Sequence, residues 1–197
     1  MVEQPVACSL PEAVGCTPAL GTSWLSRALG GGPVQDTGIY CINAARYVTG
    51  EEPVSVSARA WQPKDDSRFR EVPESVTFTL HYASGILVHC ETSFGITESR
   101  VLRVHGTKGY IDMDGAYGYR GRRLRVKRGT PDEGGAQIED LVFTPVNHFA
   151  AEMDDFSDCI QNGKATRTPG EMGLADVRII EAIEQAIDSG GTVDIER

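Results

Sequence analysis

Asp36 and Tyr40 are the residues whose types and spacing best suit chemistry on a hydroxyl group. In a helix, side chains four residues apart point the same way, so both can contact one substrate hydroxyl. A tyrosine hydroxyl acts as a general acid when a neighbouring cation or a cofactor lowers its pKa. The plain alternative is that Asp36 is a carboxylate favoured by the helix dipole, with Tyr40 half-buried beside it. Spacing alone favours that alternative, because polar pairs of this kind are common.

Two further groups of residues suggest ligand chemistry, and their spacing argues against it. The loop Gly30-Gly31-Gly32 precedes a predicted helix, yet it lacks the G-x-G-x-x-G spacing, a preceding strand and a P-loop lysine, so it predicts a tight entry turn. His81, His89 and Glu91 share one face of a predicted hairpin, a set that suits zinc or iron. No usual ligand spacing accompanies them, which favours an interface face. We therefore assign no cofactor-binding and no metal-binding residue to this chain.

A basic cluster is the third candidate, and it contrasts with the acidic chain around it. Three of its cations alternate with apolar residues, so they line one face of a strand. No aromatic residues are interleaved for base stacking, so a solvated or subunit-bridging face is favoured over a nucleic-acid groove. The cluster consists of Arg120, Arg122, Arg123, Arg125, Lys127 and Arg128.

One predicted helix carries the Asp36–Tyr40 pair. It follows Pro33, whose missing N–H costs nothing in a first turn, and ends at Gly50. Helical spacing divides its side chains into two stripes on different faces. The stripe expected to be buried is Val34, Cys41, Ile42, Ala45 and Val48, and the polar stripe is Asp36, Tyr40, Asn43 and Tyr47.

After this helix the hydrophobic period changes from 3.6 to 2, which predicts a strand over Pro53–Trp61. Two more strands follow, and matching their apolar faces pairs Tyr82 with Ile86, Leu80 with Val88 and Phe78 with Cys90. That register leaves the loop Ala83-Ser84-Gly85, with the glycine in a left-handed conformation. The opposite face is polar and has no row of lysines, so we expect it to contact a partner. Its members are Thr77, Thr79, His81, Leu87, His89, Glu91 and Ser93.

The remaining pattern completes the expected fold class. Strands are predicted over 99–105, 109–113, 123–128, 137–143 and 192–195, and an amphipathic helix over 147–161 carries Phe149, Met153, Phe156 and Ile160 on one side. A last helix begins with a capping box of Thr168, Pro169 and Glu171, and we expect it to bury Leu174, Val177, Ile180, Ile183 and Ile187. This order predicts an α+β fold: a large open, mostly antiparallel sheet with helices on one face and the other face available for subunit packing.

Composition excludes several classes of protein. The chain has 197 residues and a formal net charge of −9, which repels phosphate, so nucleic-acid and anionic-membrane partners are not expected. No apolar run is long enough to span a bilayer, and no secretory leader is recognisable. The five scattered cysteines suggest reduced thiols and a cytoplasmic protein. Residues 1–22 form a poorly defined segment, with a short edge strand possible over Val2–Leu10, before one domain over 23–197.

Four segments together resemble the second domain of the Gfo/Idh/MocA oxidoreductases. They are ALGGGPVQDTGIYCINAARYVTGEEPVSVSARAW, SRVLRVHGTKGYIDMD, NHFAAEMDDFSDCIQNG and TPGEMGLADVRIIEAIEQAIDSGGTV, and they cover the chain from about residue 24 onward. The loop MDGAYGYRGRRLRV and the stretch PGEMGLADVRIIEAI are most similar to the glucose–fructose oxidoreductase branch.

This resemblance implies roles for particular residues. The family's active site lies between this domain and an N-terminal dinucleotide-binding domain that holds NAD(P). The resemblance implies that Asp36 orients a sugar hydroxyl and that Tyr40 moves its proton during hydride transfer. Tyr119, and less strongly Tyr117, would contact the sugar or polyol. Asn43, which shares the polar stripe with Asp36 and Tyr40, would contact it too. The polar sheet face would pack against another subunit, giving a homodimer or a higher homo-oligomer.

The family's cofactor motifs are missing from this sequence. Neither a G-x-G-x-x-G loop nor a Glu-Lys-Pro motif is present, and Lys64 lies in a loop between strands, so it is no substitute. The strand by which the family enters this domain is not recognisable in residues 1–22. We therefore expect a substrate-binding and oligomerisation domain without its cofactor domain, inactive as a dehydrogenase alone. The alternatives are a non-catalytic assembly module and a stand-alone sugar-binding protein.

Overall fold

The computed structural model describes residues 6–9, 23–97, 99–129 and 137–196. These residues form a nine-stranded sheet in the order β8-β7-β6-β5-β1-β4-β3-β2-β9, in which β1 and β4 are parallel and the other neighbours antiparallel. The strands are β1 Val6–Ser9, β2 Pro53–Trp61, β3 Ser75–Tyr82, β4 Leu87–Ser93, β5 Val101–Gly106, β6 Gly109–Asp114, β7 Arg123–Arg128, β8 Gln137–Val142 and β9 Thr192–Asp194. The α-helices are α1 Ile39–Thr49, α2 His148–Asn162 and α3 Gly170–Ser189. The α+β prediction is confirmed.

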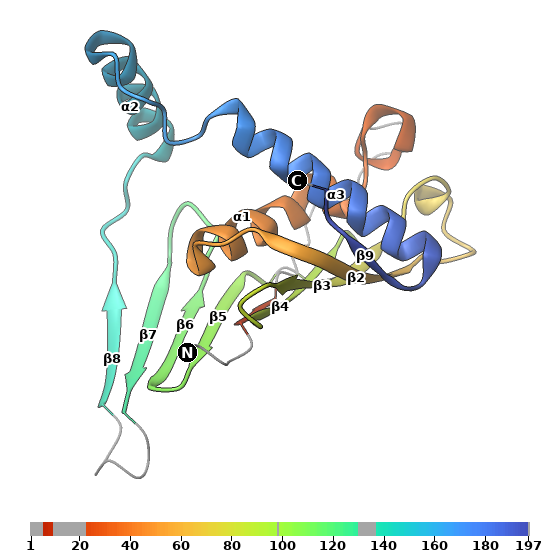
Figure 1. Ribbon diagram of the computed structural model, residues 1–197, viewed down its shortest axis with the longest axis horizontal. Helices are drawn as coiled ribbons and strands as arrows, with labels where there is room; N and C mark the ends of the chain where they lie inside the picture. The colour runs from red at the N-terminus through yellow and green to blue at the C-terminus, as the bar shows by residue number, and fades with distance from the viewer. Residues whose placement is uncertain (1–5, 10–22, 98, 130–136, 197) are drawn as a thin grey trace.

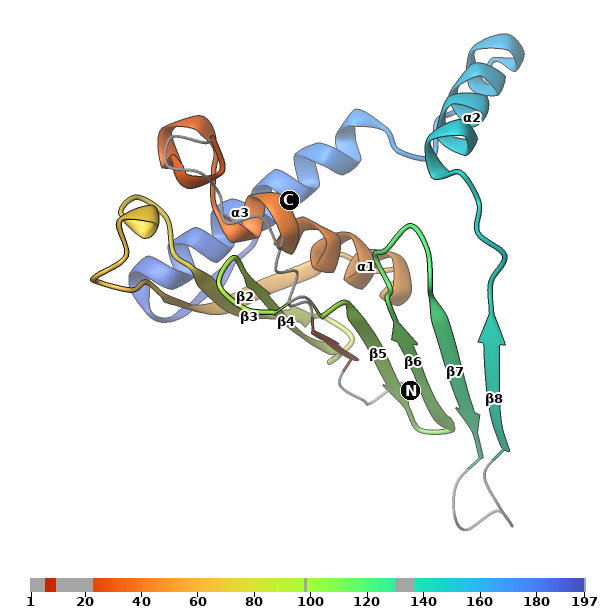
Figure 2. The same cartoon turned by 180° about the vertical axis from the view of Figure 1, so that it is seen from behind.

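Two of these helices cover one face of the sheet. Figures 1 and 2 show α1 and α3 on the same side of the strands, with α3 along β2. The core lies between them and β2, β3 and β4, where Ile42, Val56, Leu80, Val88 and Ile183 are fully buried. Each such side chain contributes about 1.5–3 kcal/mol relative to an exposed one. Among the described residues, no helix lies on the opposite face of these strands, as predicted.

The predicted hairpin has the predicted register. Phe78 pairs with Cys90 and Leu80 with Val88, and the Tyr82 amide donates to the Ile86 carbonyl at 3.1 Å. Gly85 has a φ of 91°, a conformation that side chains with a Cβ rarely adopt. Alternation of apolar and polar residues therefore determines the pairing here, because a one-residue slip would expose the whole apolar face.

The helix that carries Asp36 and Tyr40 is not one regular α-helix, which corrects the prediction. Val34–Gly38 is a π-helical turn, and α1 begins only at Ile39 and ends at Gly50 in the left-handed conformation. In a π turn the hydrogen bonds run from residue i to i+5, so the turn is wider than an α turn. Val48 was also expected to be buried and is instead exposed.

The last helix begins one residue later than predicted, and only part of its predicted stripe is buried: Ile183 is in the core, and Ile180 and Ile187 pack against it. Pro169, not Thr168, is its N-cap, and no side chain caps it. Leu174 and Val177, expected in the core, are about half exposed. The buried residues of α3 are Asp176, Ile179, Ala182, Ile183 and Ala186.

The strand near the N-terminus lies in the middle of the sheet, so the expectation of an edge strand is wrong. β1 pairs with β4 on one side and with β5 on the other, and an entering strand is therefore present. The rest of residues 1–22 lies outside the described residues, and the boundary at residue 23 stays a prediction.

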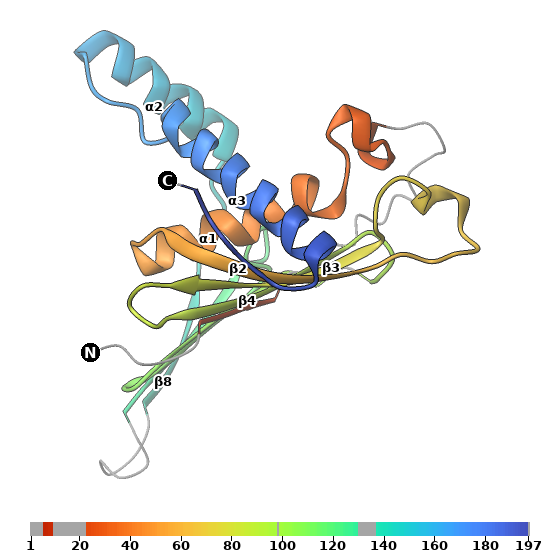
Figure 3. The same cartoon turned by 45° about the vertical axis from the view of Figure 1, so that its right-hand side comes forward.

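The far part of the molecule, which we call the wing, consists of β5 to β8 and α2. Figures 1 and 2 show α2 projecting beyond the sheet, away from α1, and Figure 3 shows it from another side. No side chain of these four strands is buried. The apolar residues of α2, namely Phe149, Met153, Phe156 and Ile160, are all more than half exposed.

Candidate functional site

Asp36 and Tyr40 lie on consecutive turns, the first on the π turn and the second at the start of α1. Asp36 is partly buried, and desolvation raises the pKa of its carboxyl above the ordinary value. Tyr40 is 46% exposed, so a ligand can contact it from solvent. A carboxyl that is partly desolvated beside an accessible phenol is an arrangement suited to holding a hydroxyl and its proton.

The glycine–tyrosine loop brings Tyr117, rather than Tyr119, to Tyr40. The ring centroids of Tyr40 and Tyr117 are 5.9 Å apart and tilted by 46°. Tyr119 packs instead against α2, with its centroid 5.6 Å from that of His148 and 5.5 Å from that of Phe149. Tyr117 thus lies against the candidate site, and Tyr119 marks a second aromatic group on the wing.

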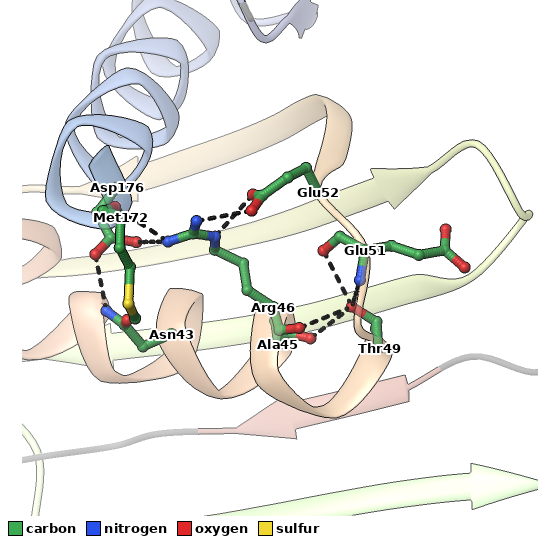
Figure 4. A network of polar contacts seen from close by, with 8 residues as sticks. All are labelled: Asn43, Ala45, Arg46, Thr49, Glu51, Glu52, Met172 and Asp176. Atoms are coloured by element: carbon green, nitrogen blue, oxygen red, sulfur yellow. Dashed lines mark hydrogen bonds and ion pairs between the residues drawn. The ribbon is translucent and has the colours of Figure 1, made fainter. Parts of the chain in front are cut away.

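Asn43, the third residue of the polar stripe, belongs to a network that ties α1 to α3 (Figure 4). Its amide donates to the Ile39 carbonyl at 3.0 Å and to the Asp176 carboxylate at 3.1 Å. Arg46 donates to the same carboxylate at 2.6 Å and to Glu52 at 2.7 Å. The side chains of Arg46 and Asp176 are only 11% and 7% exposed. This network fixes the direction of α1, and its residues other than Asn43 were not among those predicted for the site.

The glycine loop before the π turn does not fit a dinucleotide. A Cβ added at Gly31 would lie 2.4 Å from the Ser23 carbonyl oxygen and 2.5 Å from that of Trp24, so the glycine allows a close approach of two backbone segments. No strand leads directly into this loop from the described residues before it, which form short 3₁₀ turns. The prediction of a tight entry turn is confirmed, with the Gly30 and Gly31 amides donating back to Arg27 and Ser26.

The histidines of the polar face are engaged with neighbouring hydroxyls. The His81 ring is 3.3 Å from the Ser57 hydroxyl, and the His89 ring is 3.0 Å from the Thr79 hydroxyl. Within the described parts of the chain, no group of three or more His, Cys, Asp or Glu residues is placed to hold a metal ion. The same strands line a shallow hollow of about 620 Å³ that includes Thr77, His89 and Glu91.

A polar row continues from this face across the wing. Register places Arg103 opposite Asp112, Asp112 opposite Arg125, and Arg125 opposite Asp140. Arg103 donates to Asp112 at 2.5 Å, and Arg125 donates to Asp140 at 2.8 Å. The predicted basic strand face is therefore balanced by acidic residues on its neighbours. Its Lys127 lies 5.8 Å from the centroid of the Tyr110 ring.

No helix among the described segments is long and apolar enough to cross a bilayer. Two of the five cysteines, Cys41 and Cys90, are buried in the core, and Cys159 on α2 is partly exposed.

This fold and these segments define an oxidoreductase-type C-terminal α+β domain, and comparison with known proteins gives the family. The model of the GFO/IDH/MocA C-terminal domain matches residues 13–112. The chain belongs to the Gfo/Idh/MocA family.

Individual relatives agree with this assignment. The crystal structure of aldose-aldose oxidoreductase from Caulobacter crescentus, complexed with glycerol, is 36% identical, covers 98% of this chain and 56% of that one, and superimposes with a TM-score of 0.86. Levoglucosan dehydrogenase in complex with NADH is 18% identical, with a TM-score of 0.81 over 100% of this chain and 59% of that one, and shares the fold.

A relative found by sequence comparison supports the same family. D-xylose 1-dehydrogenase (NADP(+)) 2 of Haloferax volcanii is 25% identical over 168 residues, which are 85% of this chain and 49% of that protein. The chain thus spans about half the length of the curated relatives it matches.

Proposed function

We propose that this chain is the substrate-binding and oligomerisation domain of a sugar oxidoreductase similar to glucose–fructose oxidoreductase. It binds a sugar or polyol hydroxyl between Asp36 and Tyr40. The observation that carries this proposal is the placement of a partly desolvated carboxyl one turn from an accessible phenol whose ring packs on Tyr117. Relatives whose names give xylose or aldose as their substrates support the choice of a sugar.

In this proposal each residue has one task. The Asp36 carboxylate accepts a hydrogen bond from the sugar hydroxyl and orients it. Tyr40 accepts the proton of this hydroxyl as a phenolate when the sugar is oxidised, and returns it as a phenol when the sugar is reduced. Tyr117 packs on the Tyr40 ring and restricts its rotation, since the two centroids are 5.9 Å apart. NAD(P), which the family's enzymes use, supplies the hydride chemistry, and it would be held outside these residues.

Calorimetry with D-xylose and D-glucose tests the sugar site. Asp36→Asn and Tyr40→Phe should each weaken binding about tenfold or more, which corresponds to loss of one hydrogen bond to a charged or polar partner. Tyr47→Phe is the matched control, because Tyr47 lies on the same helix and is 89% exposed. Equal affinities for all three variants, or no sugar binding by the wild-type chain, contradict the proposal.

We also propose that the chain alone does not act as a dehydrogenase, because the described residues do not build a dinucleotide site. Its apolar α2 supports this proposal: proteins rarely leave such a face uncovered, and the cofactor domain of a longer protein is a suitable cover. Titration of NADPH fluorescence should show no micromolar binding. Micromolar binding by the 197-residue chain contradicts this part of the proposal.

A second candidate, a non-catalytic assembly module, is favoured by the helix-free polar face of the sheet. Ser57, Thr79 and His89 lie in one row of this face, in register with the row of charges on the wing. A homodimer through this face should dissociate when Thr77, which is exposed there, is replaced in Thr77→Arg. Tyr47→Arg, on α1 and hence on the helical side, is the control. Sedimentation that shows a monomer for the wild-type chain, or a dimer for both variants, argues against this module.

A further inference from the structure

The π turn that carries Asp36 is the most unusual piece of backbone near the candidate site. Single π turns are rare, and they are found where the surroundings hold them, frequently at functional sites. In this chain the turn covers Val34–Gly38, and the α-helix that follows it carries Tyr40. The angle between the two candidate side chains therefore depends on what keeps the turn from becoming an ordinary α turn.

A buried hydroxyl cluster contacts the base of this turn. The Pro33 carbonyl oxygen lies 3.0 Å from the Thr37 hydroxyl and 2.9 Å from the Thr92 hydroxyl, and each hydroxyl has one proton to donate, either to this carbonyl or to the other hydroxyl. The two hydroxyls also contact each other. Thr37 and Thr92 are 2% and 0% exposed, so water does not compete for these bonds. A threonine bond to a carbonyl in the same helix is known to bend helices.

Thr92 differs from Thr37 because it comes from outside the turn, on β4. Its hydroxyl contacts Pro33, and its methyl group faces Gly38 at the other end of the turn. A Cβ built on Gly38 would lie 3.3 Å from the Thr92 Cγ2 atom, so the turn and the strand are already in close contact. Both groups of the Thr92 side chain thus hold the π turn against the sheet.

We propose that Thr92 is a positioning residue, which fixes the π turn on β4 and thereby sets the direction of the Asp36 carboxyl relative to Tyr40. It does not contact the sugar. The proposal rests on the proposed function for the claim that the pair binds a hydroxyl. Its geometric part concerns this chain alone and is measured without any ligand.

A pair of conservative variants separates the two groups of the side chain. Thr92→Val keeps the methyl group and removes the hydroxyl, whereas Thr92→Ser keeps the hydroxyl. The pKa of Asp36 is measured by carbon-detected NMR during a pH titration, and hexose affinity by calorimetry. We expect Thr92→Val to move the Asp36 pKa toward its ordinary value and to weaken hexose binding about tenfold. The hexose affinity of Thr92→Ser should stay within about threefold of the wild-type value, since this variant keeps the hydroxyl.

A purely structural role gives another pattern. Both variants would then lower the melting temperature while the Asp36 pKa and hexose affinity stay at their wild-type values, and this result overturns the proposal. If Thr92→Val does not fold, Gly38→Ala tests the same contact from the other side, because the new methyl group pushes the turn off β4. An unchanged Asp36 pKa and affinity in Gly38→Ala likewise overturn it.

The same measurements distinguish this proposal from the proposed function. Hexose binding that is insensitive to Asp36→Asn and Tyr40→Phe contradicts the sugar site, whereas the ligand-free Asp36 pKa still decides the role of Thr92. If those two variants lose binding while Thr92→Val keeps the wild-type Asp36 pKa and hexose affinity, the sugar site is supported. In that case Thr92 has no positioning role in it.

Discussion

Two regions of the molecule are stabilised by different means, although their strands are of similar length. One is the half of the sheet that α1 and α3 cover, and the other is the wing. In β3 every second side chain is buried, whereas in β8 none is. The first half is stabilised by an apolar core, against which Leu102 and Val104 of β5 also pack, whereas the charged face of the wing carries a ladder of largely exposed ion pairs. Exposed ion pairs contribute little, so we infer that the wing needs a covering surface to reach comparable stability.

The candidate site lies at the boundary between these two regions. Asp36 and Tyr40 are attached to the buried half, and Tyr117 comes from a loop between two strands of the wing. Tyr117 itself packs against the edge of the core, so the site joins the two regions. Four changes test the comparison, from the largest expected effect on stability to the smallest.

Ile183→Ala in α3 should lower the free energy of unfolding by about 2–5 kcal/mol, because it leaves a cavity in the core. Ile183 is fully buried, and urea denaturation followed by circular dichroism measures the loss. Val142→Ala on β8 is the control. Because Val142 is 82% exposed, the urea midpoint of this variant should equal that of the wild type. Similar losses in the two variants would show that the wing is packed as tightly as the core.

Asp176→Ala should lower the free energy of unfolding by about 1–3 kcal/mol, because it removes one partner of the nearly buried Arg46 guanidinium. Arg46 keeps its bonds to Glu52, the main cause of its raised pKa, which limits the loss. Asp140→Asn breaks the pair with Arg125 on the exposed face of the wing and should change thermal stability far less. An equal loss at Asp140 would mean that the wing's ion pairs are shielded from water.

Asp36 and Asp140 should show pH effects of opposite sign. Burial raises the Asp36 pKa in the folded state, so its charge destabilises the fold above that pKa and the cost disappears as the pH falls toward the unfolded value of 3.8. Asp36→Asn should therefore stabilise the chain at pH 7 but not below pH 3.8. The Arg125 hydrogen bond lowers the Asp140 pKa, so that contribution is present at neutral pH and is lost on acidification. Melting curves from pH 3 to 8 check both, and a loss of stability in Asp36→Asn at pH 7 contradicts the first.

Phe156→Ser on α2 should leave the unfolding midpoint unchanged, since Phe156 is more than half exposed. Its effect should appear instead as weaker self-association in light scattering at high concentration, because an exposed apolar patch becomes smaller. Phe78→Ser, in the core, provides the contrast and should unfold the chain. A loss of stability in Phe156→Ser would show that α2 packs against the rest of the molecule in solution.

Strand pairing was predictable because alternation leaves one acceptable register, as at Leu80 and Val88. The π turn was not, because a spacing of four residues between Asp36 and Tyr40 suits an α-helix equally well. The Thr92 hydroxyl, which contacts Pro33 at the base of this turn, lies 59 residues from it in the sequence. Local patterns carry no information about such a contact.

The buried face of α3 was predicted only in part, for a related reason: Ile183 lies in the core as expected, whereas Leu174 and Val177 are about half exposed. Apolar residues occur on two faces of this helix, and hydrophobicity alone favoured the face with Leu174 and Val177. The face that packs includes Asp176, a carboxylate that is acceptable in the interior only because Arg46 and Asn43 bind it. All the residues expected at the site stay predictions, although the Tyr117 ring lies near that of Tyr40 and the Tyr119 ring contacts α2.

The position of β1 has a consequence for folding and assembly. β4 and β5 follow each other in sequence yet do not pair, because β1 occupies the gap between them. A chain in which Val6–Ser9 is displaced would present two facing strand edges with unpaired amide and carbonyl groups in mid-sheet. Such a slot accepts any extended segment of suitable length, including the same four residues of a neighbouring molecule. Deletion of these residues should therefore convert the protein into a receptor for its own first strand, supplied as a peptide.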